Sequence, residues 1–233
     1  MVEISVRKGV PIMSFVTSEF TFSHERLKNI DLNAFSDSFK VLVPDQYVEG
    51  NYRLRRYSQF TGQADSLKKL PHSRFVQSKS VNYLSGDIQR EYPDLESDLV
   101  EATQFKALIK EVSDYFCFNP DKTVLGVHQI RILCSGSDEG VPVPEGIHQD
   151  GFDLIAICCI ARHDIEGAET QLFQDPDGEP IYKCIMQPGD VIYCNDRKLY
   201  HYTAPIHASS SANVNGYRDV FVITVSLSDA RVK

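Results

Sequence analysis

Residues 146–161 read GIHQDGFDLIAICCIA, and this stretch decides how the rest of the chain is interpreted. Its second half is a continuous apolar run of the length expected for a buried strand. In the extended segment before that run, side chains alternate between two faces, so His148 and Asp150 point the same way. An imidazole nitrogen and a carboxylate oxygen therefore converge on one point, which predicts part of a divalent-metal site.

The chain beyond position 123 has the alternation and the turns of a β-rich domain. Asp175-Pro176-Asp177-Gly178 and Gln187-Pro188-Gly189-Asp190 are strong turn signals. Short strands at this spacing predict a sandwich or barrel. The expected strands are residues 124–133, 154–161, 169–173, 181–186, 190–193, 199–206 and 220–227.

The region before position 123 is expected to add helix and irregular structure to this β core. Apolar positions three and four apart predict a helix over residues 94–116, packed on the outside of the sheet. Residues 19–23 alternate as a half-buried strand does, and residues 61–74 predict a loop. With no repeat or linker, residues 1–233 are expected to form one domain. It would comprise an N-terminal elaboration over about 1–50 and a core over about 123–229.

Composition limits the class of protein and its partners. The 233 residues carry a formal net charge of −8, which disfavours a nucleic-acid partner because such proteins usually present a basic face. A run of about 18 apolar residues is absent, as are the marks of a signal peptide, so a cytoplasmic protein without a membrane partner is expected. The six cysteines include no CxxC pair and are expected to be buried free thiols.

A metal held by His148 and Asp150 needs a third ligand, and two histidines are candidates. His201 lies in the strand-like stretch Leu199-Tyr200-His201-Tyr202-Thr203, whereas His207 opens a polar stretch that is expected to be an exposed loop. A strand holds a ligand more rigidly than a loop does, so His201 is favoured. Two histidines and one carboxylate on one face of the metal are typical of non-haem iron(II) oxygenases.

Arg218 follows His201 by 218 − 201 = 17 residues and is expected to open the final strand. A guanidinium at the mouth of an apolar barrel offers a planar fork for a carboxylate. Taken alone, Arg218 is better explained as a surface arginine paired with Asp219 or another acid. Together with the histidines, it is better explained as the partner of a carboxylate cosubstrate that chelates the metal.

The order HxD, His and then Arg resembles the 2-oxoglutarate/iron(II)-dependent dioxygenases, and further stretches are similar to the bacterial branch that includes the L-isoleucine 4-hydroxylases. These stretches are Leu125-Gly126-Val127-His128-Gln129-Ile130-Arg131, Tyr200-His201-Tyr202-Thr203-Ala204-Pro205, Tyr217-Arg218-Asp219-Val220, and Phe75-Val76-Gln77-Ser78-Lys79 followed by Tyr83. The resemblance covers roughly residues 50–229. The resemblance implies a mainly β fold with flanking helices, the double-stranded β-helix or jelly-roll that cupins share.

The resemblance also implies the chemistry and the residues that serve it. Fe(II) would be held by His148, Asp150 and His201, and Arg218 would bind the distal carboxylate of 2-oxoglutarate. With O2 the enzyme would hydroxylate a free L-amino acid and release succinate and CO2, with no catalytic side chain beyond the metal ligands. The alternatives are a 2-oxoglutarate oxygenase acting on a peptide, protein or other small molecule, and a non-oxidative cupin-like metal-binding protein.

Weaker candidates for substrate binding lie on two other segments. Gln129 and Arg131 share one face of their strand, and Arg131 would hold a substrate carboxylate if that face is the barrel interior. A solvent-facing or ion-paired arginine is the more ordinary explanation for Arg131. His128 on the opposite face is better explained as a core histidine. The cluster of Arg53, Arg55 and Arg56 could line the substrate entrance, but a solvated face with local ion pairs is the more ordinary explanation.

Overall fold

The computed structural model describes residues 20–62, 66–77, 79, 87–119, 122–209 and 215–227. Within these ranges one antiparallel sheet has the strand order β1-β9-β5-β12-β4-β2-β3. All thirteen residues of β12 pair with β4, which makes these two strands the spine of the sheet. The strands are β1 (Phe22–Arg26), β2 (Arg53–Thr61), β3 (Lys68–Lys69), β4 (Thr123–Ser135), β5 (Leu154–His163), β9 (Asp190–Cys194) and β12 (Asn215–Leu227).

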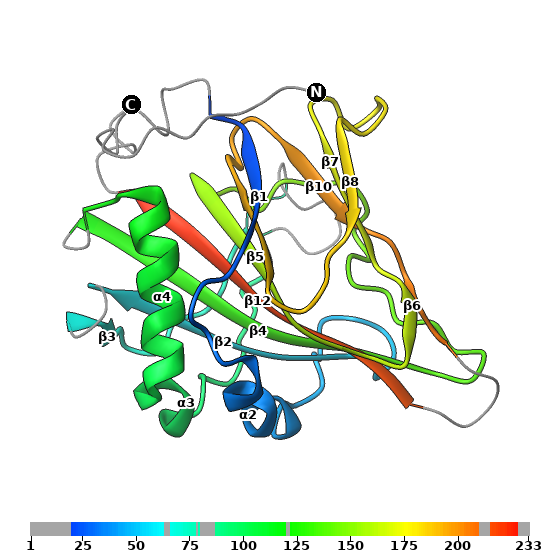
Figure 1. Cartoon of the computed structure of the whole chain (residues 1–233), viewed down its shortest axis with the longest axis horizontal. Helices are drawn as coiled ribbons and strands as arrows, with labels where there is room; N and C mark the ends of the chain where they lie inside the picture. Colours follow the sequence, from blue (N-terminus) through cyan, green and yellow to red (C-terminus); the bar gives the residue numbers. More distant parts are fainter. Residues whose placement is uncertain are drawn as a thin grey trace.

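A second layer of short strands faces one side of this sheet. It contains a three-stranded sheet in the order β10-β7-β8 and the pair β11-β6. Apolar side chains of β5, such as Ile155 and Ile157, pack here against Leu172 and Met186. The strands are β6 (Ile165–Gly167), β7 (Glu169–Phe173), β8 (Tyr182–Ile185), β10 (Tyr200–Thr203) and β11 (Ile206–Ala208). The two opposed layers confirm the predicted jelly-roll with flanking helices (Figure 1).

Helices cover the other side of the large sheet, and Figure 1 shows α4 crossing in front of β12, β4 and β2. The helical segments are η1 (Leu32–Phe35), α2 (Ser36–Lys40), α3 (Ser97–Glu101) and α4 (Thr103–Phe116). Phe105, Leu108, Ile109 and Val112 recur at three- and four-residue steps and are fully buried in the core against the sheet. None of the helices in the described ranges is both long enough and apolar enough to cross a membrane.

The single helix expected over residues 94–116 is wrong, because the chain breaks at Ala102 into α3 and α4. Ala102 is extended, with φ −63° and ψ 135°. The break follows from the spacing of the buried side chains. Leu99 and Phe105 are six residues apart, which in one continuous helix would place them about 120° apart around the axis. The extended residue lets both side chains enter the same core.

Strands β4, β5, β7, β8 and β9 confirm the expected strands to within two residues at either end. The strand expected over 199–206 is instead two strands, β10 and β11, which are separated by Ala204 and Pro205 and pair with different partners. Proline lacks the N–H that a continuous ladder needs. The last strand begins at Asn215 rather than at 220, and the N-terminal strand is 22–26 rather than 19–23, of which Glu19 lies outside the described residues.

Replacing Phe221 with alanine is expected to lower the free energy of unfolding by about 3–5 kcal/mol. The Phe221 ring is 0% exposed, and its centroid lies 5.3 Å from that of Phe35, 5.2 Å from Phe39 and 6.0 Å from Phe105. The large cavity left under the helices cannot close without moving them. Urea unfolding followed by circular dichroism measures the loss, and a loss below about 1 kcal/mol would contradict this packing.

Candidate active site

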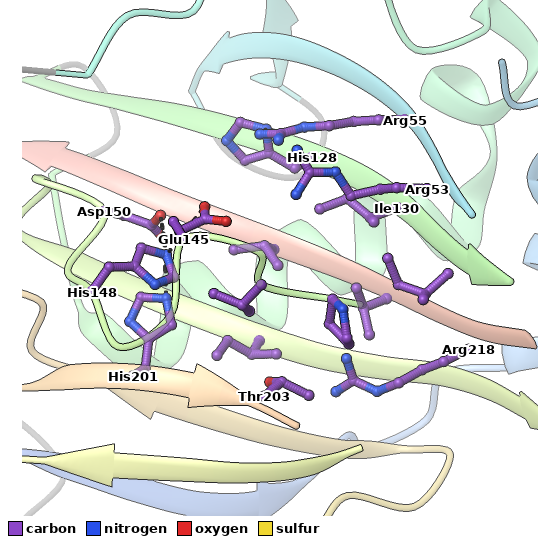
Figure 2. A pocket seen from close by; sticks show the side chains of 16 residues that line it. Arg53, Arg55, His128, Ile130, Glu145, His148, Asp150, His201, Thr203 and Arg218 are labelled. Atoms are coloured by element: carbon purple, nitrogen blue, oxygen red, sulfur yellow. Dashed lines mark hydrogen bonds and ion pairs between the residues drawn. The ribbon is translucent and has the colours of Figure 1, made fainter. Parts of the chain in front are cut away.

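A cavity opens between the two layers, and its wall comes from alternate residues of the central strands. Strand β12 contributes Arg218, Val220 and Val222, and β10 contributes His201 and Thr203. The other lining residues are Arg53 and Arg55 of β2, His128, Ile130 and Ile132 of β4, Ile157 of β5, and Pro142, Val143, Glu145, His148 and Asp150 of the segment between β4 and β5. Figure 2 shows His148, Asp150 and His201 at one end of this cavity and Arg218 at the other.

The structure brings together His148, Asp150 and His201, whose potential ligand atoms all lie within 4.8 Å of one another. The Nε2 atom of His148 is 3.5 Å from Asp150 Oδ1, and Nε2 of His201 is 3.7 Å from Asp150 Oδ2. Two backbone hydrogen bonds, of 3.1 and 2.8 Å, join His148 to His201 and fix one histidine beside the other. The HxD segment therefore acts as an added strand on β10.

Hydrogen bonds decide which nitrogen of His148 is free to bind a metal. Its Nδ1 lies 3.0 Å from the backbone oxygen of Gly146, which can only accept, so Nδ1 carries the proton and Nε2 keeps its lone pair in the neutral ring. Gly146 adopts φ +76°, a left-handed conformation that suits glycine, and this turn aims its carbonyl back at the ring.

The ionisation of the three groups reflects their mutual contacts. Burial alone would lower the pKa of His148, but the Asp150 carboxylate outweighs it and raises that pKa to about 9. Burial lowers the pKa of His201 to about 4, and the positive charge of His148 adds to the effect. Burial opposes ionisation of Asp150, yet the two histidines hold the pKa of its carboxyl well below the usual range. Asp150 is therefore a carboxylate at neutral pH.

Two buried side chains fix the backbone and carboxylate of Asp150. The carboxylate of Asp196 accepts hydrogen bonds from the backbone N–H groups of Asp150 and Phe152, at 2.9 and 2.8 Å. Its Oδ1 also lies 4.0 Å from His201 Nδ1. Burial, with the charge of Asp150 adding to it, raises the pKa of Asp196 to about 7. Gln77 donates to the Asp150 backbone oxygen at 2.9 Å and to Oδ1 at 3.3 Å. Both roles depend on long-range contacts, and the sequence analysis missed them.

Arg218 lies inside the fold, not at its surface, with only 2% of the residue exposed. Its guanidinium contacts the Met186 sulfur at 3.8 Å, and no carboxylate among the described residues lies within ion-pairing distance. Asp219, the ordinary surface partner considered above, instead pairs with Arg131 through two hydrogen bonds of 2.7 Å. Arg218 is thus a buried cation that faces the cavity and has no counter-ion among the residues that the structure describes.

Gln129 and Arg131 do not line this cavity, so the expectation that they face the barrel interior is wrong. Their face of β4 is turned to the helices, where Gln129 donates to the Ser38 hydroxyl at 2.8 Å. His128 and Ile130, on the alternate positions, form the wall instead. The error has a physical cause. A buried ion pair with Asp219 neutralises Arg131 on the helical side, so the presence of a charged residue did not identify the face of β4 that lines the cavity.

The arginine cluster of β2 divides between the two faces of its strand. Arg56 points to the face opposite the cavity, where it pairs with Glu96 and donates to the backbone oxygens of Asp94 and Val41. Arg53 and Arg55 are buried and line the cavity, contrary to the solvated face that was favoured from the sequence. The exposed His207 lies in β11 rather than in a loop, with Glu139 3.9 Å away. Ser78 and Tyr83 lie outside the described residues.

A family model described as 2OG-Fe dioxygenase matches residues 36–224, which include the whole cavity wall. The chain belongs to this family. The 2OG-Fe dioxygenases use Fe(II), 2-oxoglutarate and O2, so this protein is a 2-oxoglutarate-dependent dioxygenase.

Relatives of this dioxygenase cover nearly its whole length. The 3(1)-hydroxy-L-isoleucine 4-dioxygenase of Pantoea ananatis is 25% identical over 215 residues, which are 89% of this chain and 86% of that protein. The crystal structure of a BsmA homologue from Methylobium petroleophilum has a TM-score of 0.77 at 23% identity and covers 94% of each chain. IDO from Bacillus thuringiensis has a TM-score of 0.73 at 15% identity, covering 97% of this chain and 99% of its own. The two crystal structures share the fold of this dioxygenase.

The residues present fit the cofactors that this family uses. Two imidazoles and one carboxylate are the donor set of a non-haem iron(II) site that leaves positions open for other ligands. Metal bonds of about 2.1 Å place neighbouring donor atoms roughly 3 Å apart, so the observed 3.5 and 3.7 Å need only a slight contraction. The buried Nε of Arg218 has no hydrogen-bond partner among the described residues, which suits an anionic cosubstrate.

Binding of Fe(II) to this dioxygenase at pH 7 is expected to release about one proton per ion. The metal needs neutral imidazoles, and of the three groups only His148, with its pKa raised to about 9, is protonated at that pH. Affinity should therefore rise about tenfold per pH unit toward pH 9 and then level off. Anaerobic calorimetry in two buffers of different ionisation enthalpy counts the proton. An equal heat in both buffers would contradict the raised pKa.

Proposed function

We propose that this dioxygenase hydroxylates an unactivated C–H bond of a free L-amino acid, with His148, Asp150 and His201 holding Fe(II) and Arg218 binding the distal carboxylate of 2-oxoglutarate. The observation that carries the proposal is the buried Arg218, which has no counter-ion in the described part of the chain and shares one cavity with the three metal-ligand candidates. A buried charge of this kind is costly unless a ligand neutralises it.

The side chains divide the work of the reaction. When bound, Fe(II) supplies the O2 chemistry that converts 2-oxoglutarate, O2 and the substrate C–H into succinate, CO2 and the C–OH product. Arg218 fixes the far end of 2-oxoglutarate with a planar fork. Ile130, Ile132, Val220 and Val222 form the apolar part of the wall between the two ends of the cavity, where they exclude water. No side-chain acid or base is assigned.

The amino-acid substrate is supported by a relative and by the charges of the cavity. The Pantoea protein carries an amino-acid derivative in its name, hydroxyisoleucine, and matches this chain over 215 residues. The cavity also contains cationic groups besides Arg218, so it can take a second carboxylate. A free amino acid is a small substrate that carries such a carboxylate.

Succinate release tests the proposal directly. The purified protein is incubated with Fe(II), ascorbate and 2-oxoglutarate and screened across the free L-amino acids, with short peptides as a second panel and His201→Ala as the control. Succinate that rises with an amino acid, together with a product heavier by one oxygen, is the expected result. Turnover of peptides alone would show a different substrate class. Succinate formation that persists in His201→Ala would contradict the assignment of His201 as a metal ligand.

A further inference from the structure

Three buried arginines lie at the β2 side of the cavity, and two of them share a single carboxylate. Arg53, Arg55 and Arg90 are only 5%, 7% and 2% exposed. Asp45, itself buried, lies 2.8 Å from Arg53 Nε and 4.0 Å from Arg55 NH1, both through the same oxygen. Arg90 donates instead to the neutral amide of Gln77. In the described part of the chain, one carboxylate therefore lies within ion-pairing distance of two guanidinium groups, and Arg90 has no carboxylate within that distance.

Such an excess of buried positive charge predicts an anionic ligand. Burying an ionised group without a counter-ion costs several kcal/mol even after the protein relaxes. The Nε atoms of Arg55 and Arg90 are buried and have no hydrogen-bond partner among the described residues. Of the three arginines, Arg53 and Arg55 line the cavity, because they are two apart on β2 and share its inner face.

Aromatic rings hold Arg55 in place before any ligand arrives. Its guanidinium carbon lies 4.4 Å from the ring centre of Tyr92 and 5.4 Å from that of Phe75. Its NH2 group donates to His128 Nδ1 at 2.7 Å, and the His128 ring stacks on Tyr57 at 4.4 Å. Arginine cannot accept a hydrogen bond, so His128 is neutral with its proton on Nε2. The group is a rigid cationic fork of the kind that preorganised ligand sites use.

This fork is separate from Arg218. In the large sheet, β4 lies between β2, which carries Arg53 and Arg55, and β12, which carries Arg218. Figure 2 shows the two groups entering the cavity from different sides, with the His148, Asp150 and His201 cluster at its end. The cavity thus has two anchors for carboxylates, and 2-oxoglutarate occupies one of them under the proposed function.

The remaining charged group of the wall has the opposite sign. Glu145 lines the same cavity from the turn before the HxD segment, and its Oε1 lies 3.9 Å from His148 Nε2. It stands outside the group of potential metal ligands formed by His148, Asp150 and His201. An α-amino acid carries a carboxylate and an ammonium on one carbon, so a cavity with an arginine pair and a glutamate offers both charges a partner.

We propose that Arg53 and Arg55 bind the carboxylate of the amino acid that is oxidised, and that Glu145 accepts its ammonium group. This inference rests on the proposed function, and it assigns the substrate end of the cavity to β2. The substrate side chain is then left to point along the apolar wall formed by Ile130 and Ile132 toward the metal.

The test measures substrate binding without turnover. Protein loaded with Fe(II) and 2-oxoglutarate is titrated anaerobically, by calorimetry, with each standard L-amino acid and with the matching carboxylic acid that lacks the amino group. For the best ligand, Arg53→Met and Arg55→Met are each expected to raise Kd on the order of 100-fold while Kd for 2-oxoglutarate stays within about threefold. Glu145→Gln should remove the preference for the amino acid over its des-amino analogue.

Arg56→Met is the matched control, because Arg56 lies on the same strand with its side chain on the outer face. Its substrate Kd should equal that of the wild type. If Arg55→Met does not fold, the amino-acid amide serves as a probe on the unaltered protein and should bind on the order of 100-fold more weakly than the acid.

The outcomes separate the two proposals. Unchanged substrate affinity in Arg53→Met and Arg55→Met, or equal binding of the acid and the amide, would overturn the inference and leave the proposed function standing. A des-amino acid that binds through the arginines while no amino acid does would leave the carboxylate site standing and overturn the amino-acid function. If no carboxylate in either panel binds, both fail.

Discussion

Asp150→Asn is expected to lower the rate of succinate formation by at least about a thousandfold while the protein stays folded. Asp150 is the single carboxylate of the three-residue group and presents one oxygen to each histidine Nε2, at 3.5 and 3.7 Å. The amide keeps the shape and the backbone contact to Asp196 but loses the negative charge that attracts a divalent ion. Loss of an outer-shell partner already costs 10–100-fold, so loss of a ligand should cost more. Succinate release and bound iron per chain are measured together.

Gln149 provides the control for this variant, because it lies between the two ligands in sequence but lines a different pocket with Gly151, Asp153 and Arg197. Gln149→Ala should retain activity within about threefold. An Asp150→Asn protein that binds iron and releases succinate like the wild type would show that the metal lies elsewhere.

Local sequence predicts the part of the site whose geometry depends only on neighbouring residues. His148 and Asp150 lie two residues apart in an extended segment, and that spacing alone places both side chains on one face. His201 was preferred over His207 on the expectation that only His201 lies in a strand; both do, but the structure joins His201 to His148 by two backbone hydrogen bonds. Local spacing therefore predicts His148 and Asp150, whereas the contact that distinguishes His201 from His207 is the long-range pairing with His148.

The contacts that the sequence did not reveal all depend on distant partners. Arg131 and Arg55 each follow strand alternation, but only the register of β4 with β12 and of β2 with β4 decides which one faces the cavity. Asp219 neutralises Arg131 on the helical side, whereas Arg55 shares Asp45 with Arg53. The sequence shows the charges but not their counter-ions.

The fold was predicted best where turns and alternation agree. Strand β7 ends just before one clear turn signal and β9 begins at the other, and both lie where they were expected to within one residue. The predicted helix failed because the apolar pattern was read as continuous across Ala102, although the six-residue step from Leu99 to Phe105 does not fit one helical face. Tertiary packing, which requires both side chains in one core, outweighed the preference for a longer helix.

Arg218→Met is expected to raise Kd for 2-oxoglutarate by about 100- to 1,000-fold and to leave iron affinity unchanged. The methionine fills the same space beside Met186, whereas the cosubstrate carboxylate would be left buried without its cation, a loss of about 3–4 kcal/mol. Arg218→Lys keeps the charge without the planar fork and should recover part of the affinity. Anaerobic titration with 2-oxoglutarate measures all three proteins. If Arg218→Met instead loses the amino acid, and Arg55→Met loses 2-oxoglutarate, the two arginine sites have exchanged the roles assigned to them.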